Sequence, residues 1–367
     1  MSTVDRVAPG IDTDEQAALR DSVRGLLAAQ SDVRRGYAGN PRYDVRLWQG
    51  LTQQIGVAAL AIPEEFGGIG ATLVETHVVL EELGASLSPV PVLGSAVLAA
   101  RAILRSGDAA ACERLLPGIA EGTTIAALCW AGESGWDQPG VRADSGLLSG
   151  TARYVLDAEY ADLLIVLAES GGVTTLHSVA ADTDGVTIEP HTVLDPTRAL
   201  ATVRFDEVDA DAILAPADLA DQLRTVAAIA VSADQIGAAR AALDLTVEYT
   251  KSRTQFGRVI GSFQALKHRM ADLFVLNESS TSISYTAVDA LVRESDEASA
   301  LAAAARVYCT DALRQVTSET VQLHGGIGIT WEHDAHLYFK RAHSDSVLFG
   351  SEPEALAELE IVAGLTD

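Results

Sequence analysis

One segment of the chain combines the side chains that a phosphate-bearing ligand with a ring would need. Residues 251–272 read KSRTQFGRVIGSFQALKHRMAD and contain Arg253, Gln255 and Phe256. A guanidinium binds phosphate, an aromatic ring stacks on another ring, and a glycine allows close approach of the backbone. The Gly-Ser pair that follows can end one helix and cap the next. The pattern alone is also typical of solvated charges near a helix end, and Arg258 is predicted to be one.

A second segment, residues 321–341, follows a long helical pattern and reads VQLHGGIGITWEHDAHLYFKR. Together the two segments resemble the C-terminal signatures of the FAD-dependent acyl-CoA dehydrogenase family. These are Arg-x-x-Phe-Gly with a Gln several residues on, and Gln-x-x-Gly-Gly-x-Gly. The matching residues are Arg253, Phe256, Gly257, Gln264, Gln322, Gly325, Gly326 and Gly328. A third match, IPEEFGGIG at residues 62–70, extends the resemblance to the N-terminal part of the chain.

The resemblance implies α,β-desaturation of an acyl-CoA thioester, with FAD as the hydride acceptor. Such activity belongs to β-oxidation and lipid metabolism, and it leaves fatty, branched and steroid side-chain CoA esters open as substrates. It also implies an electron-transfer flavoprotein as the electron acceptor. The residues expected to bind FAD are Arg253, Gln255, Phe256, Phe263, Gln264, Gln322, Gly325 and Gly326.

The general base that this chemistry needs is not found at its usual positions. The thioester acidifies the α-carbon, so a desolvated carboxylate can remove its proton. Of the two positions at which family members carry that carboxylate, one matches Phe349 and the other matches Ala227. Asp234 lies seven residues further along the same helix, about 10 Å along its axis, whereas a base must come within roughly 3 Å of its proton. Asp234 and Glu352 are therefore weak candidates, and both are predicted to be structural.

The part of the chain that would face the flavin ring also departs from the family. Residues 130–136 read WAGESGW where the family has a Thr-Glu-Pro-x-x-Gly-Ser-like loop, and Leu156 replaces a hydrogen-bonding threonine. In the family each FAD lies across a subunit pair. One subunit's β domain holds the ring, and its neighbour's Arg and Gly-Gly segments hold the diphosphate and adenosine.

The retained donor segments and the altered ring-binding segments together favour a partner role. The resemblance predicts a non-catalytic subunit that completes the FAD site of a homologous acyl-CoA dehydrogenase subunit in an α2β2 heterotetramer. One alternative is a self-sufficient homotetramer whose base is Asp234 or Glu352. The other is a structural subunit that binds no flavin.

Composition limits the other classes of function. The chain has 26 Lys+Arg and 51 Asp+Glu residues and a net charge of −25, which disfavours nucleic acid and anionic membranes as partners. Three cysteines fit neither a metal site nor a disulfide framework and are predicted to be buried apolar residues in a reducing cytoplasm. We expect no signal peptide and no apolar run that approaches the roughly 18 residues of a membrane span.

The elements that must position these residues are mostly helices. Apolar spacing and turn residues predict helices, then strands, then long helices, an α+β and mostly helical chain. The resemblance implies that these elements form the acyl-CoA dehydrogenase fold. Its predicted parts are an N-terminal helical domain (1–118), a middle antiparallel β domain (119–217) and a C-terminal helical bundle (218–367). Long helices are predicted at residues 219–250, 262–293 and 296–323, in a bundle that can continue across subunit interfaces.

Two helix starts and one helix end can be predicted more closely. Thr13 with Gln16, and Thr72 with Glu75, have the spacing of capping boxes. Gly84 is predicted to end the helix that the second box begins.

Overall fold

The computed structural model describes residues 12–39, 42–362 and 365. The chain divides into two compact units, each built from separate segments. The first comprises Met1–Arg24, His77–Leu87 and Ala228–Asp367, and the second comprises Gly25–Thr76 and Ser88–Ala227. The three domains predicted from the sequence (1–118, 119–217 and 218–367) divide the chain by type of secondary structure instead, and these limits stay a prediction.

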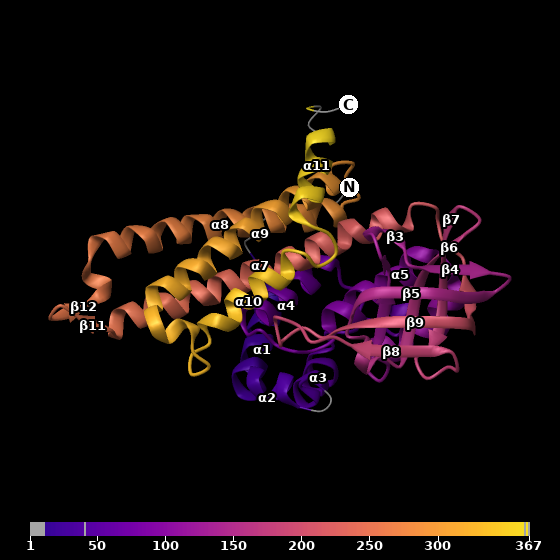
Figure 1. Cartoon of the computed structure of the whole chain (residues 1–367), viewed down its shortest axis with the longest axis horizontal. Coiled ribbons are helices and arrows are strands. Elements are labelled where there is room, and N and C mark those ends of the chain that lie inside the picture. The colour runs from indigo at the N-terminus through magenta and orange to yellow at the C-terminus, as the bar shows by residue number, and fades with distance from the viewer. Residues whose placement is uncertain (1–11, 40–41, 363–364, 366–367) are drawn as a thin grey trace. The chain divides into compact units, whose positions relative to one another are not determined.

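Helices make up nearly all of the first unit, and three of them are long. Figure 1 shows α7, α8 and α9 running alongside one another, with a short β-hairpin between α7 and α8 at one end. The predicted limits of all three helices are confirmed to within two residues. The elements that contribute to this unit are α1 (Asp14–Gln30), α4 (Leu73–Ala85), α7 (Leu219–Ser252), β11 (Thr254–Gln255), β12 (Arg258–Val259), η5 (Ile260–Ser262), α8 (Gln264–Val292), α9 (Ala298–His324), η6 (Gly325–Ile329), α10 (Ala335–Asp345) and α11 (Glu352–Val362).

Both predicted capping boxes are present. The Thr13 amide donates to Gln16 Oε1 at 3.0 Å, and the Gln16 amide donates to Thr13 Oγ1 at 3.2 Å. At the second box the Thr72 amide donates to Glu75 Oε2 at 2.8 Å. These bonds satisfy amides that the first turns of α1 and α4 would otherwise leave unpaired.

The crossing of α4 and α7 explains a glycine that we had predicted to end a helix. Helix α4 continues through Gly84 to Ala85. A Cβ atom on Gly84 would lie 2.1 Å from the carbonyl oxygen of Asp234, and one on Gly237 would lie 1.8 Å from that of Glu81. The two glycines therefore allow the backbones of α4 and α7 to touch, and the prediction that Gly84 ends α4 is wrong.

A buried charge cluster joins four helices in the same region. Glu82 on α4 is 3% exposed and accepts hydrogen bonds from Arg20 at 2.6 Å, from Arg24 at 2.7 Å and from Arg240 at 2.9 Å. Tyr285 on α8 donates to the adjacent Glu81 at 2.8 Å. Burial alone would raise the pKa of Glu82, but its hydrogen bonds to Arg24 and the charge of Arg240 outweigh burial and hold that pKa below its usual value.

Helix α7 corrects the expectation that no segment has the length and apolarity of a membrane span. An 18-residue window of this helix has a mean hydropathy of 1.3, and 83% of the window is buried inside the protein. A helix that is apolar on all sides belongs in the core of a large protein or in a membrane. Burial of this kind is that of a core helix.

The predicted burial of the cysteines is confirmed. Cys112, Cys129 and Cys309 are buried free thiols. Burial raises the pKa of all three, to about 12 for Cys309. Because the thiolate is the reactive form, none of them is suited to act as a nucleophile.

The second unit combines short helices with one large sheet. Its helical elements are α2 (Val33–Ala38), α3 (Val45–Gly50), η1 (Leu51–Ile55), η2 (Glu64–Phe66), η3 (Val92–Ala99), α5 (Ala100–Ser106), α6 (Ala109–Ala120) and η4 (Ala158–Tyr160). Its strands are β1 (Ala126–Cys129), β2 (Ala131–Gly132), β3 (Gly135–Pro139), β4 (Val141–Asp144), β5 (Leu147–Leu156), β6 (Leu163–Ser170), β7 (Val173–Ala180), β8 (Val186–Pro190), β9 (Leu200–Asp209) and β10 (Asp211–Ile213).

The sheet is mixed rather than purely antiparallel. Its strand order is β10-β7-β6-β4-β5-β9-β8, and β1 pairs with β6 off this path. Strands β1 and β4 both run parallel to β6, whereas the other pairs are antiparallel. The chain leaves β1 through the β2–β3 hairpin, passes through β4 and β5, and returns to β6, a path that apolar alternation alone does not reveal.

We expect Glu82→Gln to lower the free energy of unfolding by on the order of 3 kcal/mol at pH 7, because three arginines would lose the buried carboxylate that they share. The pKa of Glu82 is depressed in the folded protein, so its contribution is present above the unfolded pKa of about 4.5 and is lost as the pH falls below it. Urea unfolding at pH 7 and pH 4 would measure both effects.

The matched control is Glu189→Gln, which removes an exposed carboxylate that pairs with Arg204 at 3.2 Å. Such surface pairs contribute about 0–1 kcal/mol. Equal losses in the two variants would contradict the structural role of the cluster.

Candidate functional site

The two chain segments that resemble the family signatures meet at one end of the bundle. Gln235 on α7 donates to Thr310 on α9 at 3.0 Å, and Thr246 donates to Thr320 at 3.0 Å. Because residue numbers rise together along both helices, α7 and α9 run in the same direction. Their C-terminal ends therefore lie together, and α8 begins beside them after the hairpin, as Figure 1 shows.

The hairpin after α7 exposes an aromatic side chain in a strained conformation. Arg253 directly follows α7, and Gln255 pairs with Arg258 across a two-residue turn. Phe256 and Gly257 form that turn with φ values of 53° and 76°, as a type I′ turn requires. A bulky residue at positive φ costs roughly 1–3 kcal/mol, and the side chain of Phe256 is nevertheless 93% exposed. The strained backbone of Phe256 places its ring in solvent rather than in the core, which points to a contact with a group outside this chain.

Arg258 is exposed, as the sequence predicted, but it also contacts an aromatic side chain of the same segment. Its guanidinium lies 4.0 Å from the centre of the Phe263 ring, and Phe263 meets Phe256 edge to face at 6.2 Å. A cation over an aromatic face is stabilising even where it is exposed. Arg258 therefore supports the aromatic pair, and its loss would disturb the hairpin.

The surroundings of the hairpin are positive in an otherwise acidic protein. Residues 251–269 contain five Lys and Arg residues and no Asp or Glu, against a net charge of −25 for the whole chain. Arg253 is exposed, and its guanidinium makes no hydrogen bond or ion pair within the described part of the chain. A positive patch with an unpaired guanidinium suits a diphosphate.

The glycine segment at the end of α9 offers a second open surface. Gln322, Gly325 and Gly326 are exposed. Gly325 adopts φ 63° and ψ −142°, which ends the helix in a conformation that favours glycine. A Cβ on Gly326 would meet nothing within 4 Å, and its φ is not positive. No contact within the described residues therefore requires glycine at position 326. Close approach of an external group to the backbone is the physical reason for a glycine here.

The remaining predicted ligands lie at the start of α8. Gln264 is its first residue and is exposed, and Phe263 directly precedes it. The amides of a helix N-terminus carry partial positive charge, which adds to the positive surroundings of the hairpin. The structure thus brings all eight predicted residues to one end of the bundle. An unpaired guanidinium, exposed amides, an exposed aromatic ring and an open glycine fit the diphosphate and adenosine end of FAD.

The positions of the general base have a different character. Phe349 adopts φ 60°, and Ala227 is fully buried in α7. Asp234 is 3% exposed and accepts two hydrogen bonds from Arg341, at 3.1 and 2.9 Å. This ion pair commits Asp234 to the interior of the bundle. Glu352 is the first residue of α11, and its side chain lies outside those that the structure describes.

A buried arginine that the sequence analysis missed holds the loop around Phe349. Arg306 on α9 is 4% exposed and donates from Nη2 to the carbonyl oxygens of Asp345, Leu348 and Gly350 at 2.6, 2.9 and 3.1 Å. These bonds fix the turn in which Phe349 adopts its positive φ. An arginine among alanines on the buried face of a helix was the only signal in the sequence.

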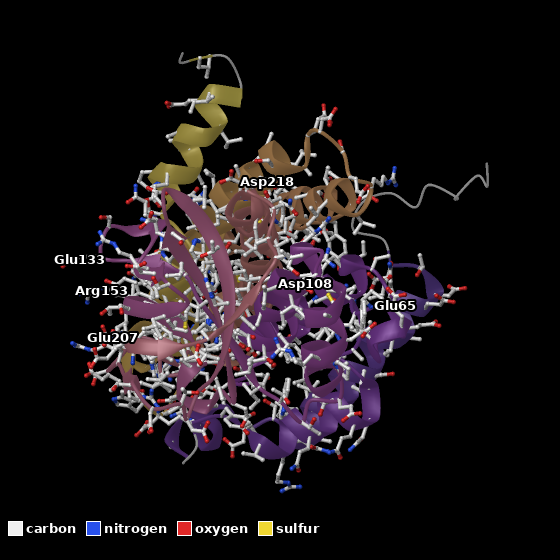
Figure 2. The ribbon with its side chains drawn as sticks, turned by 90° about the vertical axis from the view of Figure 1, so that its right-hand side faces the viewer. Glu65, Asp108, Glu133, Arg153, Glu207 and Asp218 are labelled. Carbon is white, nitrogen blue, oxygen red and sulfur yellow. The ribbon has the colours of Figure 1, made fainter. Side chains whose placement is uncertain are left out.

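The ring-binding segments of the second unit present aromatic side chains and have no threonine at the matched position, which is Leu156. Tyr154 lies at an irregularity of β5 with φ 53° and is 44% exposed. Its ring centre lies 6.4 Å from that of Trp136 and 6.1 Å from that of His191. Beside them Arg153 and Glu133 approach to 3.9 Å, and Figure 2 shows both at one edge of the unit. This surface offers rings and charges but no threonine.

The end of β5 and the residue after it are buried. Leu156 is 4% exposed and has no hydrogen-bonding side chain, as the sequence indicated. Burial raises the pKa of the adjacent Asp157 to about 7, against the opposing effects of Arg198 and the Gly94 amide. Asp157 is thus a buried acid that titrates near neutral pH, and no sequence motif distinguished it.

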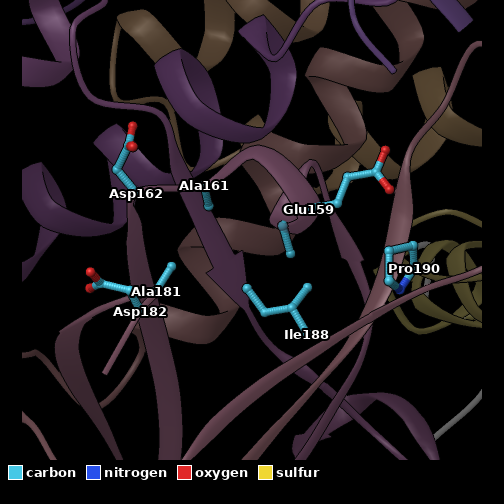
Figure 3. Close-up of a pocket in the computed structure, with 8 residues that line it drawn as sticks. Glu159, Ala161, Asp162, Ala181, Asp182, Ile188 and Pro190 are labelled. Atoms are coloured by element: carbon cyan, nitrogen blue, oxygen red, sulfur yellow. The ribbon is translucent and has the colours of Figure 1, made fainter. Parts of the chain in front are cut away.

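The same sheet carries a pocket of about 540 Å³ that the sequence did not predict. Figure 3 shows Asp162 and Asp182 on one side of it, Glu159 on the other, and Ile188 with Pro190 beside them. None of the predicted ligands lines it. The pocket therefore adds nothing to the site at the helix ends.

Comparisons with known proteins identify the family of this chain. The acyl-CoA dehydrogenase N-terminal domain family matches residues 13–123, and the C-terminal domain family matches residues 220–357. Acyl-CoA dehydrogenase IpdE2 of Mycolicibacterium smegmatis is 40% identical over 95% of this chain and 98% of its own length.

Solved structures of relatives share the fold. A variant of the Tcur3481–Tcur3483 steroid ACAD has a TM-score of 0.89 at 30% identity, over 96% of this chain and 99% of that one. The ChsE4–ChsE5 complex from Mycobacterium tuberculosis has a TM-score of 0.89 at 27% identity, over 98% of this chain and 99% of that one. From its sequence, its fold and the residues gathered at its helix ends, the chain belongs to the acyl-CoA dehydrogenase family.

Proposed function

We propose that this chain is the non-catalytic subunit of a heteromeric, FAD-dependent acyl-CoA dehydrogenase. Its helix-end residues would complete the FAD site of a homologous catalytic partner. The proposal rests on a contrast between two parts of the site. Arg253, predicted to bind the diphosphate, is exposed, and its guanidinium has no partner among the described residues. The two positions of the general base hold Phe349 and Ala227, neither of which is a carboxylate. Two structural neighbours are named as a two-component steroid ACAD and as a two-component complex, which supports a heteromer.

The roles of this chain in the reaction follow from its side chains. FAD, when bound, supplies the acceptor for the hydride that leaves the β-carbon of the acyl-CoA. Arg253 would donate charge-assisted hydrogen bonds to the diphosphate, and Gln322 would donate from its amide. Gly326 would let the adenosine end approach the backbone, and Phe256 would cover an apolar face. Removal of the α-proton would fall to a carboxylate of the partner, because the base positions of this chain hold none.

The substrate we propose is an acyl-CoA thioester, with a steroid-derived acyl chain as the favoured class. The name of the Tcur3481–Tcur3483 steroid ACAD supports that class. A buried aspartate paired with Arg341 disfavours the self-sufficient homotetramer, since Asp234 would have to leave that pair to act as a base. The exposed and unpaired Arg253 disfavours a flavin-free structural subunit.

The chain purified alone should bind little FAD and show little dehydrogenase activity, and co-expression with a catalytic family member should restore both. The physical reason is that Phe349 and Ala227 provide no base and Leu156 provides no hydroxyl to the ring. Flavin absorbance and acyl-CoA oxidation, measured for the chain alone and for the complex, would test this. A yellow, active homo-oligomer would instead support the homotetramer, and a colourless complex would support the flavin-free subunit.

In the complex, Arg253→Ala should weaken FAD binding by about 10- to 150-fold, as expected for loss of hydrogen bonds to a charged group. Arg253→Lys should recover only part of the affinity, because an ammonium keeps the charge but not the planar fork. FAD content after gel filtration, beside circular dichroism for folding, provides the measurement.

The control for Arg253 is Lys251→Ala rather than a change at Arg258. Lys251 carries the same charge two residues away and is paired with Glu248 at 2.6 Å. Its loss should leave FAD content unchanged. Equal FAD content in wild type and Arg253→Ala would refute the proposed contact.

We also expect the complex to pass electrons to an electron-transfer flavoprotein rather than to oxygen. The expectation rests on membership of the family. Steady-state turnover with the flavoprotein, compared with turnover in oxygen alone, would measure it. A full rate with oxygen as the only acceptor would show that the complex works as an oxidase.

A further inference from the structure

Two aromatic side chains connect the helix ends that carry the proposed FAD ligands. The rings of Tyr249 on α7 and His324 on α9 stack with centres 4.4 Å apart and an interplanar angle of 27°. The Tyr249 hydroxyl also donates to the carbonyl oxygen of His324 at 3.3 Å. The amide of Arg253 donates to the Tyr249 carbonyl at 2.9 Å, so the stack lies one helical turn before that residue. On the other helix, His324 directly precedes Gly325.

The histidine is held in one tautomer. His324 is 3% exposed, and its Nδ1 lies 2.7 Å from the carbonyl oxygen of Thr320. Because a carbonyl can only accept, Nδ1 carries the proton. Burial lowers the pKa of His324, and the neighbouring His333 lowers it further. The ring is therefore neutral at pH 7 and stacks on Tyr249 without a charge.

His333 packs against both rings of this stack, with its ring centre 6.2 Å from that of Tyr249. Its ring centre lies 4.4 Å from that of His324, and its Nδ1 accepts from the amide of Ala335 at 3.2 Å. That bond leaves the proton of a neutral His333 on Nε2. The three rings thus pack against one another where α9 ends and the glycine segment begins.

We propose that Tyr249 and His324 are positioning residues that set the spacing between Arg253 and the Gln322–Gly326 segment, so that one dinucleotide can contact both. This inference rests on the proposed function. Neither side chain needs to touch the ligand. A ligand held at two points loses affinity when the distance between those points is free to vary, because binding must then also order the protein.

The simpler role for this pair is core packing, and the two roles make different predictions. The stack lies between the elements proposed to hold the diphosphate and adenosine, not the flavin ring. FMN has the ring and one phosphate but no adenosine. A positioning role therefore affects FAD and spares FMN, whereas a loss of packing that disturbs the bundle or the assembly affects both flavins.

The test uses the complex after its flavin has been removed, titrated with FAD and with FMN and followed by flavin fluorescence. We expect Tyr249→Ala to weaken FAD binding about 10-fold or more while FMN binding changes less than about 2-fold. Tyr249→Phe keeps the stack and loses only the hydroxyl, so it should restore most of the FAD affinity. His324→Phe keeps a ring and should fall between these two.

The matched control is His343→Ala, because Phe339 and His343 on α10 form a similar ring pair at 4.3 Å without contact to a proposed ligand. It should leave both affinities unchanged. Circular dichroism and gel filtration would report folding and assembly for each variant, and Tyr249→Phe provides a mild change should Tyr249→Ala fail to fold.

The possible results separate this inference from the proposed function. Loss of FAD affinity in Arg253→Ala with full affinity in Tyr249→Ala would overturn the positioning role alone. Equal losses for FAD and FMN in Tyr249→Ala would likewise reduce the stack to core packing. Full FAD affinity in Arg253→Ala would overturn the proposed function, and the positioning role with it.

Discussion

The arrangement at the helix ends depends on one constraint, namely that α7 and α9 run in the same direction in close contact. Two helices can run in the same direction in close contact only if the connection between them brings the chain back to the starting end of the first helix. Helix α8, with its 29 residues, is that connection. The contact includes the buried hydroxyls of Thr246 and Thr320, which hydrogen-bond to each other at 3.0 Å. Buried hydroxyls are costly when unpaired, so a shift of one helix along the other would break this bond and the Tyr249–His324 stack together.

The charges of the first unit fall into two groups with different roles. Interior charges are paired with one another: Glu82 binds three arginines, and Asp234 binds Arg341. Removing one partner from such a set leaves a buried charge that nothing compensates, so these residues are committed to the fold. At the helix ends the guanidinium of Arg253 has no such commitment. Arg253 is thus available to an external anion, whereas the interior arginines Arg20 and Arg341 are committed to carboxylates of the same chain.

Sequence patterns predicted local features better than contacts between distant segments. Helix limits follow largely from neighbouring residues, and those of the three long helices were correct to within two residues, whereas the end of α4 was not because its glycine serves a contact with α7. The parallel pairing of β1 with β6 was missed because alternation of apolar residues specifies a strand but not its neighbour. The contact of Arg258 with Phe263 and the pairing of Asp234 with Arg341 were missed for the same physical reason. A charge close in sequence to a motif cannot be assigned as solvated or paired until the fold brings its partner near.

The family resemblance selected the residues proposed to bind FAD by their spacing, and the same match assigned Phe349 and Ala227 to the two positions of the general base. A general base typically contributes about 10²–10⁴-fold to a rate. Phe349 occupies its position in a turn that Arg306 holds by three hydrogen bonds, so the loop is built to stay in place without a carboxylate. A loop that had merely lost its function would need neither the buried arginine nor the positive φ of Phe349. A turn held in place with Phe349 instead of a carboxylate agrees with the proposal that a partner subunit performs the proton transfer.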